Sequence, residues 1–189
     1  MAITEDELKS RLDRVNSWIN NCDQKISILL AVEGVVLTIF CTSDYIGWIH
    51  QKLIFPIYNY YETGNGEFSL INAIQLCLLA VMLVMIILSI FYSLQVIKGT
   101  INASMFKQSG LTEKSLLHFA SISNKSFSDF KRETINQSDE SVINDLLSQI
   151  YINSSICTTK FKHLKKSMCS FCTFLFLLVI MMVIQFVIK

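Results

Sequence analysis

Excess charge of either sign is missing from this sequence of 189 residues. The formal net charge is +1, because 16 lysine and arginine residues are nearly balanced by 15 aspartate and glutamate residues. Because positive and negative charges are so nearly balanced, the protein has no overall basic surface, and we do not expect nucleic acid as a partner. Charged residues are also few, at 16% of the chain, so any electrostatic signal must be local.

Recognisable catalytic motifs are absent as well. The sequence holds no glycine-rich phosphate loop, no Gly-x-Ser-x-Gly and no His-Glu-x-x-His, and its three histidines are scattered. Cys169 and Cys172 have a Cys-x-x-Cys spacing, but no second pair completes a zinc site. We interpret the six cysteines as reduced thiols within or beside apolar stretches. The sequence therefore predicts no catalytic residue, no metal and no cofactor, and a protein that is not an enzyme.

Apolar residues are present in excess, at 52% of the chain, which is more than a soluble domain of this size keeps out of water. The stretches 26–42, 68–97 and 168–188 come close to or exceed the ~20 apolar residues that cross a bilayer. We therefore predict an all-α membrane protein with three transmembrane helices. A cytosolic amphipathic helix, 1–25, precedes the first, and a cytosolic helical segment, 98–167, lies between the second and the third.

The distribution of lysine and arginine gives the orientation of these spans. The segment 1–25 has four such residues and the segment 98–167 has ten, whereas 43–67 has only Lys52. The positive-inside rule places the N-terminus and 98–167 in the cytosol and the C-terminus outside. The outer segment 43–67 is rich in aromatic residues, which favours an interfacial loop over a folded ectodomain. These aromatic residues are Tyr45, Trp48, Phe55, Tyr58, Tyr60 and Tyr61.

Two heptad seams run into the first and third spans from the cytosolic side. The first consists of Leu8, Leu12, Val15, Ile19, Cys22 and Ile26, and the second of Ile143, Leu147, Ile150, Ser154, Cys157, Phe161, Leu164 and Met168. Such seams need an apolar partner, which is either another helix of the same chain or a second copy in a coiled coil. Between the seams, 111–122 reads as a short helix with Thr112 as its N-cap.

Glu33 is the one charged residue within the first predicted span. An ionised carboxylate there costs roughly 2 kcal/mol or more, so it needs a partner or water. Two interpretations stay open. Glu33 either bonds to Asn72 or Gln75 of the second span or lies near the cytosolic interface, or else Glu33, Asn72 and Gln75 belong to a polar path through an oligomer.

Four lysines lie just before the third span: Lys160, Lys162, Lys165 and Lys166. Anionic lipid headgroups are the ordinary partner of cations at this depth, and an anionic ligand such as a nucleotide phosphate is the alternative.

Two patches of the sequence, taken together, resemble a known family. The first runs from Val15 through Trp18 to Asp23 and Lys25, and then from Leu29 to Gly34. The second comprises Leu117, His118, Phe119, Ala120, Ile122, Phe127 and Phe130, and continues from Asp145 through Gln149, Ile150 and Tyr151 to Lys160 and Phe161. This pattern resembles the transmembrane effectors of bacterial Pycsar anti-phage systems.

The resemblance implies a partner cyclase that makes cyclic CMP or cyclic UMP during infection. The effector would then impair the inner membrane and cause abortive infection. No cyclic-nucleotide-binding β-roll is recognisable, so the ligand would bind between helices or between the subunits of a homo-oligomer. A cyclic phosphate needs cations and a pyrimidine needs a ring to stack on. The candidate residues on this basis are Lys125, Lys131, Arg132, Lys160 and Phe119.

Two other functions remain open at this point. A small constitutive ion channel would conduct without any nucleotide, and a membrane scaffold would bind a cytosolic partner through its heptad helices.

Overall fold

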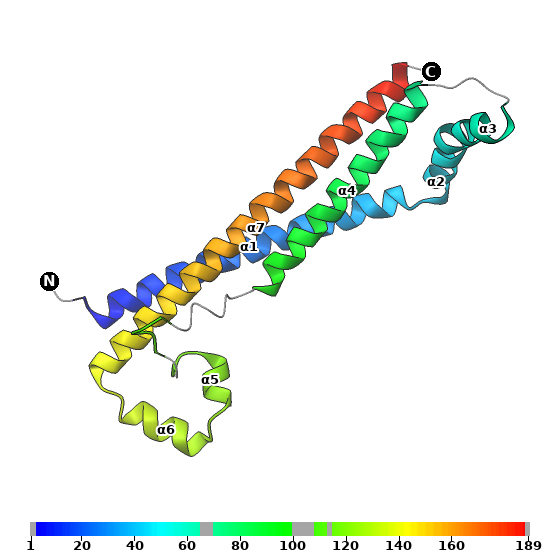
Figure 1. Ribbon diagram of the computed structural model, residues 1–189. Helices are drawn as coiled ribbons and strands as arrows, with labels where there is room; N and C mark the ends of the chain where they lie inside the picture. The colour runs from blue at the N-terminus through cyan, green and yellow to red at the C-terminus, as the bar shows by residue number, and fades with distance from the viewer. Residues whose placement is uncertain (1–2, 65–69, 100–107, 113–114, 188–189) are drawn as a thin grey trace. The chain divides into compact units, whose positions relative to one another are not determined.

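The computed structural model describes residues 3–64, 70–99, 108–112 and 115–187, and every regular element among them is helical (Figure 1). The predicted all-α class is thereby confirmed. The long helices are α1, Glu5–Phe40, α4, Leu70–Lys98, and α7, Asp139–Val187. The short ones are α2, Ser43–Ile49, the π-helical turn η1, His50–Ile54, α3, Phe55–Thr63, α5, Phe119–Ser123, and α6, Phe127–Ile135.

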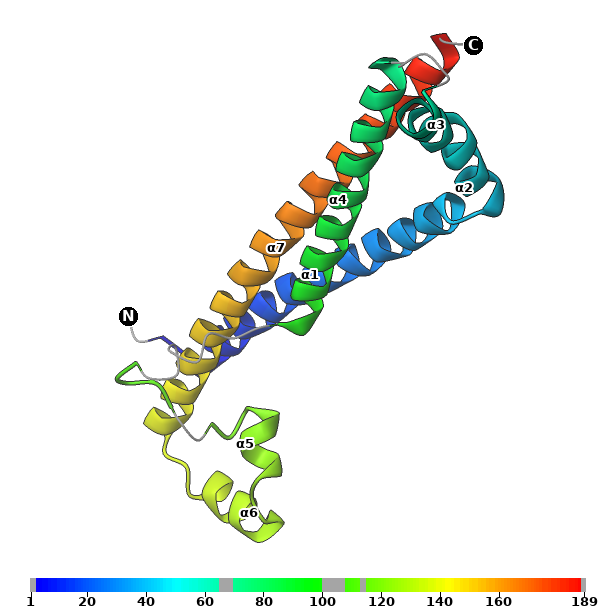
Figure 2. The same ribbon diagram turned by 45° about the vertical axis from the view of Figure 1, so that its right-hand side comes forward.

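The chain divides into two compact units, and each long helix contributes residues to both. Unit 1 consists of Met1–Gln24 and Gln95–Lys162, and unit 2 of Lys25–Leu94 and His163–Lys189. Within unit 2, α4 and the later part of α7 run side by side in both views (Figures 1 and 2).

Apolar side chains hold unit 2 together. On α4 the buried positions Gln75, Leu79, Met82, Ile86, Ser89 and Ser93 recur at alternating steps of four and three residues, which places them on one helical face. The core cluster joins part of this face to η1 and α7, and contains Leu53, Leu79, Met82, Ile86, Phe171, Phe174 and Met181. The ring of Phe40 from α1 lies 5.6 Å from that of Phe174.

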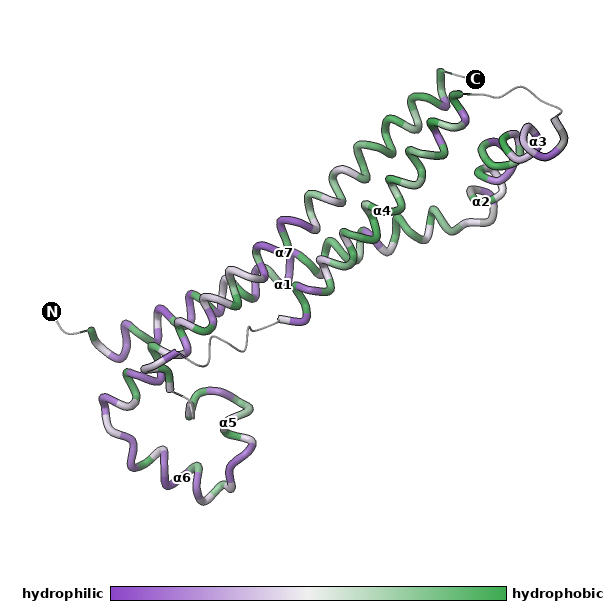
Figure 3. The backbone as a smooth tube through the Cα atoms, in the orientation of Figure 1, coloured by the Kyte–Doolittle hydropathy of each residue, from purple (hydrophilic) through white to green (hydrophobic). Residues whose placement is uncertain are grey.

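In the part of the chain that the structure describes, two helices are long and apolar enough to cross a bilayer, α4 and α7. Their best 18-residue windows have mean hydropathies of 2.9 and 2.5. Figure 3 shows α4 hydrophobic almost throughout, and α7 hydrophobic in its later part only. Both helices expose large apolar side chains such as Ile87, Phe91 and Phe176. The apolar part of α1 after Lys25 ends at Phe40 and contains Glu33, so the first predicted span, 26–42, remains a prediction.

The segment after α1 differs from the expected interfacial loop. Residues 43–63 form α2, η1 and α3 in succession. Pro56 stands in the first turn of α3, where a missing N–H does no harm, and Gly64 closes the helix with φ +63°. Leu53 is part of the core, and Trp48 and Ile49 pack against it. The rest of the expected loop, and the predicted start of the second span at 68–69, lie outside the described residues.

The first heptad seam is confirmed in unit 1 and beyond, because Leu8, Val15, Cys22 and Ile26 are all buried. The second seam is confirmed in part, because Cys157 and Leu164 are buried. Its Leu147, Phe161 and Met168 are exposed, while the neighbouring face buries Asp145, Leu146, Gln149, Ile152 and Lys160. Polar residues lie on this buried face because they find partners inside unit 1, as the next section describes.

The predicted helix 111–122 is also wrong. Of this range, the described residues before Phe119 are not helical, and α5 begins only at Phe119. Side chains of α7 take the hydrogen bonds that a helix would use: the Thr112 N–H donates to Ser148 Oγ at 3.0 Å and the Leu116 N–H to Asp145 Oδ2 at 2.9 Å. These contacts with α7 already satisfy the two backbone N–H groups, so forming a helix here would gain no further hydrogen bonds for them.

Candidate functional site

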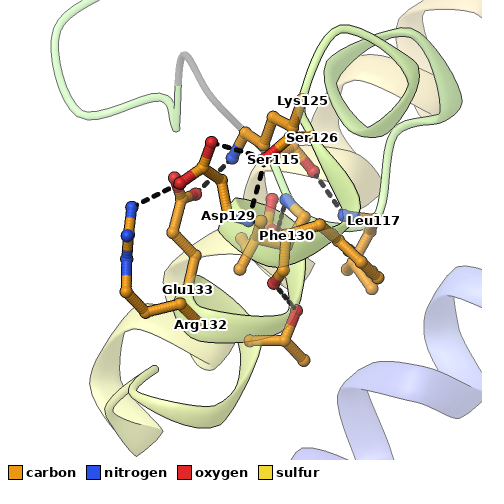
Figure 4. Close-up of polar contacts among 11 residues, drawn as sticks. Ser115, Leu117, Lys125, Ser126, Asp129, Phe130, Arg132 and Glu133 are labelled. Atoms are coloured by element: carbon orange, nitrogen blue, oxygen red, sulfur yellow. Dashed lines mark hydrogen bonds and ion pairs between the residues drawn. The ribbon is translucent and has the colours of Figure 1, made fainter.

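The start of α6 carries a cluster of polar contacts (Figure 4). Ser126 caps the helix, accepting from the Asp129 N–H at 3.2 Å and donating from its hydroxyl to Asp129 Oδ2 at 2.7 Å. Arg132 Nη2 donates to Asp129 Oδ1 at 2.6 Å. The Ser126 hydroxyl, and secondly the charge of Arg132, hold the pKa of Asp129 below its usual range. Lys125 and Glu133 form a second ion pair here.

Two of the predicted nucleotide-binding cations are thus brought together around α6, Lys125 and Arg132. Lys131 is exposed on the same helix. Phe119 at the start of α5 is 78% exposed, and its ring contacts that of His118 at 4.7 Å. Its face is therefore accessible in this chain, as a stacking platform requires.

Lys160 is placed differently from the other predicted cations. Its side chain is only 9% exposed, and Nζ donates to Asp23 Oδ1 of α1 at 2.5 Å. Its Cε lies 3.5 Å from the point where a Cβ on Gly99 would stand, and Gly99 has φ +55° directly after α4. The glycine leaves room for the lysine, and the lysine places a positive charge at the C-terminal end of a helix, where it is favourable. A hydrogen bond of 2.9 Å from Asn153 to Asn16 joins the same two helices.

A cavity of about 480 Å³ lies between the start of α7 and the end of α6. Its lining consists of Thr112, Leu116, Arg132, Glu133, Asn136, Gln137, Ser138, Ser141 and Asp145. Asp145 is 1% exposed, and its Oδ1 has no hydrogen-bond partner among the residues that the structure describes. A buried carboxylate oxygen without a partner costs free energy, typically about 1–3 kcal/mol. The arrangement therefore favours a ligand that donates a hydrogen bond.

Glu33 lies in a second polar cluster, which belongs to unit 2. Ser89 Oγ is within hydrogen-bond distance of Glu33 Oε1, and also lies 3.0 Å from the Ser167 carbonyl oxygen and 3.2 Å from Ser167 Oγ. Ser93 Oγ lies 2.7 Å from Ser167 Oγ. All four side chains are at most 1% exposed. Glu33 Oε2 has no hydrogen-bond partner among the described residues. The carboxylate of α1 thus contacts Ser89 of α4, which in turn contacts Ser167 of α7.

Sequence reasoning named other partners for Glu33. Gln75 is buried, but it lies fourteen residues before Ser89 in α4, which is about 21 Å along a helix. Asn72 is half-buried a turn further on in the same direction. Glu33 therefore finds its hydrogen bond at Ser89 instead. The signal was present in the sequence, because Ser89 and Ser93 stand four residues apart in an otherwise apolar run and so share one face.

Of the lysines before the third predicted span, Lys166 contacts an aromatic ring. Its Nζ lies 5.0 Å from the ring centre of Tyr92, which also stacks on His163 at 6.0 Å. His163 Nδ1 is buried without a hydrogen-bond partner in the described chain. Across the described ranges, no group of three or more His, Cys, Asp or Glu residues is arranged to hold a metal ion.

Comparison with known proteins gives one family and one relative. The model of the Pycsar effector protein domain, PycTM, matches residues 7–188. The Pycsar effector protein GmPycTM of Gulbenkiania mobilis is 36% identical over 164 residues, which cover 84% of this chain and 83% of that protein. No solved structure matches. The family match extends over both compact units.

Proposed function

The chain belongs to the Pycsar transmembrane effector family, a family of anti-phage effectors, and from this premise we propose how it acts. It responds to cyclic CMP or cyclic UMP, made by a partner pyrimidine nucleotide cyclase, by impairing the inner membrane. Infected cells then stop supporting the phage, which is abortive infection. The observation that carries this proposal is the family match over residues 7–188.

Membrane impairment is supported by the character of unit 2. Its helices α4 and α7 are of membrane-spanning length and hydropathy, and their outer faces carry large exposed apolar side chains. In water such faces would associate, whereas lipid tails or a second copy of the chain cover them favourably. The active form in this proposal is a homo-oligomer.

The proposed topology has three spans, with α1 after Lys25 as the first. Ile28, Val32, Val35 and Ile39 are exposed along this part of α1, as expected for side chains that face lipid. The N-terminus and unit 1 lie in the cytosol, and the C-terminus lies outside, in agreement with the excess of lysine and arginine in 1–25 and 98–167.

Unit 1 is the sensor in this proposal, and it works by binding and not by catalysis. It contains the ion pairs of α6 and the cavity at the start of α7, which are cytosolic in the proposed topology. An anion that binds these cations competes with Asp129 and Glu133 for them. Such competition provides the differential interaction that a ligand needs to shift a conformational equilibrium.

The test is the membrane potential of bacteria that express this protein, followed with a voltage-sensitive dye. The cells carry either an active pyrimidine cyclase or a catalytically inactive variant of the same cyclase. Depolarisation with the active cyclase alone is the expected result. Depolarisation in both strains would favour the constitutive channel, and a steady potential in both would favour the scaffold.

A further inference from the structure

We propose that the cavity at the start of α7 holds the base of the activating nucleotide, and that Asp145 accepts a hydrogen bond from the exocyclic amine of cytosine. The inference rests on the proposed function and goes beyond it, because it names the binding site and the base that the site selects.

Asp145 is the residue that carries the inference. It is 1% exposed and lines the cavity, where its two oxygens have different roles. Oδ2 accepts the Leu116 N–H at 2.9 Å. Oδ1 is buried and has no partner among the described residues. A buried acceptor without a partner, on a residue that lines a cavity, is suited to a ligand that brings an N–H group.

The size and lining of the cavity agree with a mononucleotide. Its volume of about 480 Å³ falls in the range of small-molecule sites, roughly 300–1,000 Å³. Neutral hydrogen-bonding side chains make up much of the lining, namely Asn136, Gln137, Ser138 and Ser141. These side chains suit the polar edge of a base and a ribose.

The phosphate of the ligand needs a cation, and the lining of the cavity supplies one. Arg132 is the cation of the lining, its side chain is 67% exposed, and one of its hydrogen bonds goes to Asp129. A guanidinium has five donors, so Arg132 has further donors for a cyclic phosphate. Glu133 also lines the cavity, and its charge is offset by Lys125.

The carboxylate favours cytosine over uracil for electrostatic reasons. The amine of cytosine presents N–H donors, which aspartate and glutamate accept in base recognition. In uracil a carbonyl oxygen stands at that position, and it would face the negative Oδ1. Each correct pairing of this kind discriminates by about 10–100-fold.

The experiment measures binding of cyclic CMP and cyclic UMP to the full-length protein in lipid nanodiscs by calorimetry. The Asp145→Asn variant turns an amide N–H₂ toward the base, while its oxygen still accepts the Leu116 N–H. Asp139→Asn makes the same change at an exposed position of the same helix, outside the cavity. We expect the wild type and Asp139→Asn to prefer cyclic CMP, and Asp145→Asn to lose at least about tenfold of that preference.

A ligand analogue tests the site without any substitution in the protein. Cyclic CMP with two methyl groups on the exocyclic nitrogen lacks the donor, and we expect the wild type to bind it at least about tenfold more weakly than cyclic CMP. Three results would overturn the assignment of Asp145 and leave the proposed function standing. They are equal binding of the analogue and cyclic CMP, a wild-type preference for cyclic UMP, and an unchanged ratio of the two nucleotide affinities in Asp145→Asn. Failure of the wild type to bind either nucleotide would overturn both.

Discussion

The two compact units of this protein provide for their charged side chains in different ways. Unit 1 pairs charge with charge, as in Lys160 with Asp23, Lys125 with Glu133 and Arg132 with Asp129. In unit 2 the buried carboxylate of Glu33 has the hydroxyl of Ser89 within hydrogen-bond distance. The core cluster of unit 2 consists of apolar side chains. The difference indicates that a charged ligand has counterparts to displace in unit 1, whereas unit 2 depends on side-chain fit.

The largest expected effect tests the apolar side of this comparison. Phe174→Ala removes a ring that is 2% exposed and lies in the core cluster of unit 2. We expect a loss of about 3–5 kcal/mol in stability, because the substitution leaves a cavity. Thermal unfolding in detergent, followed by circular dichroism, measures it. Phe176→Ala on the same helix is the control, since this ring is 65% exposed, and equal losses for both variants would contradict the assignment of the core.

The next largest expected effect tests the charge pairs of unit 1. Lys160→Met keeps the apolar stem of the side chain but leaves Asp23 without this partner. Because Asp23 is 43% exposed, water compensates in part, and we expect a loss of about 1–2 kcal/mol. Lys162→Met, at an exposed position two residues later, is the matched control. If the two variants melt alike, the ion pair does not contribute to the folded state.

Glu33 gives a smaller effect on stability and a functional one. Glu33→Gln preserves an acceptor for Ser89, so we expect a change of about 1 kcal/mol or less in stability. If Glu33 belongs to a polar path, the variant lowers the nucleotide-triggered ion leakage from liposomes. Asp44→Asn, an exposed acid of α2, serves as the control. Leakage equal to that of the wild type would count against the path.

The smallest expected effect is a dependence on pH at α6. The pKa of Asp129 is lowered in the folded protein, so its ionised form stabilises the fold at neutral pH. That contribution is present above the ordinary aspartate pKa of about 3.9 and is lost as the pH falls through the lowered folded value. We therefore expect Asp129→Asn to melt slightly below the wild type at pH 7. The two should converge near pH 2, and a constant difference would argue against this linkage.

The long apolar elements could be predicted from the sequence, because length and composition alone identify them. The second predicted span, 68–97, corresponds to α4, and the third lies within α7. The N-terminal seam was also correct, since Leu8, Val15 and Cys22 repeat in a helix whose other faces are polar. In such a helix the apolar stripe defines the buried face without ambiguity.

The buried face of α7 in unit 1 could be predicted only in part, as at Cys157. Asp145 and Lys160 are buried because Leu116 and Asp23, remote in sequence, supply partners. Hydropathy assigns such residues to the surface. In unit 2 the difficulty is the reverse, because exposed and core positions of α4 are equally apolar, as Ile87 and Ile86 illustrate. Glu33 itself was visible in the sequence, but its serine partners depend on how three helices pack.

The hydroxyl hydrogen of Ser89 can be placed in more than one way within the Glu33 cluster. Its hydroxyl carries one hydrogen, yet Glu33 Oε1, the Ser167 carbonyl and Ser167 Oγ all lie within its reach. One hydrogen cannot serve three acceptors, so more than one hydrogen-bond arrangement fits the same heavy-atom positions. Rotation about a single C–O bond is enough to exchange them. The carboxylate of Glu33 can therefore gain or lose the Ser89 hydroxyl as a donor by rotation of that hydroxyl alone, without movement of any helix.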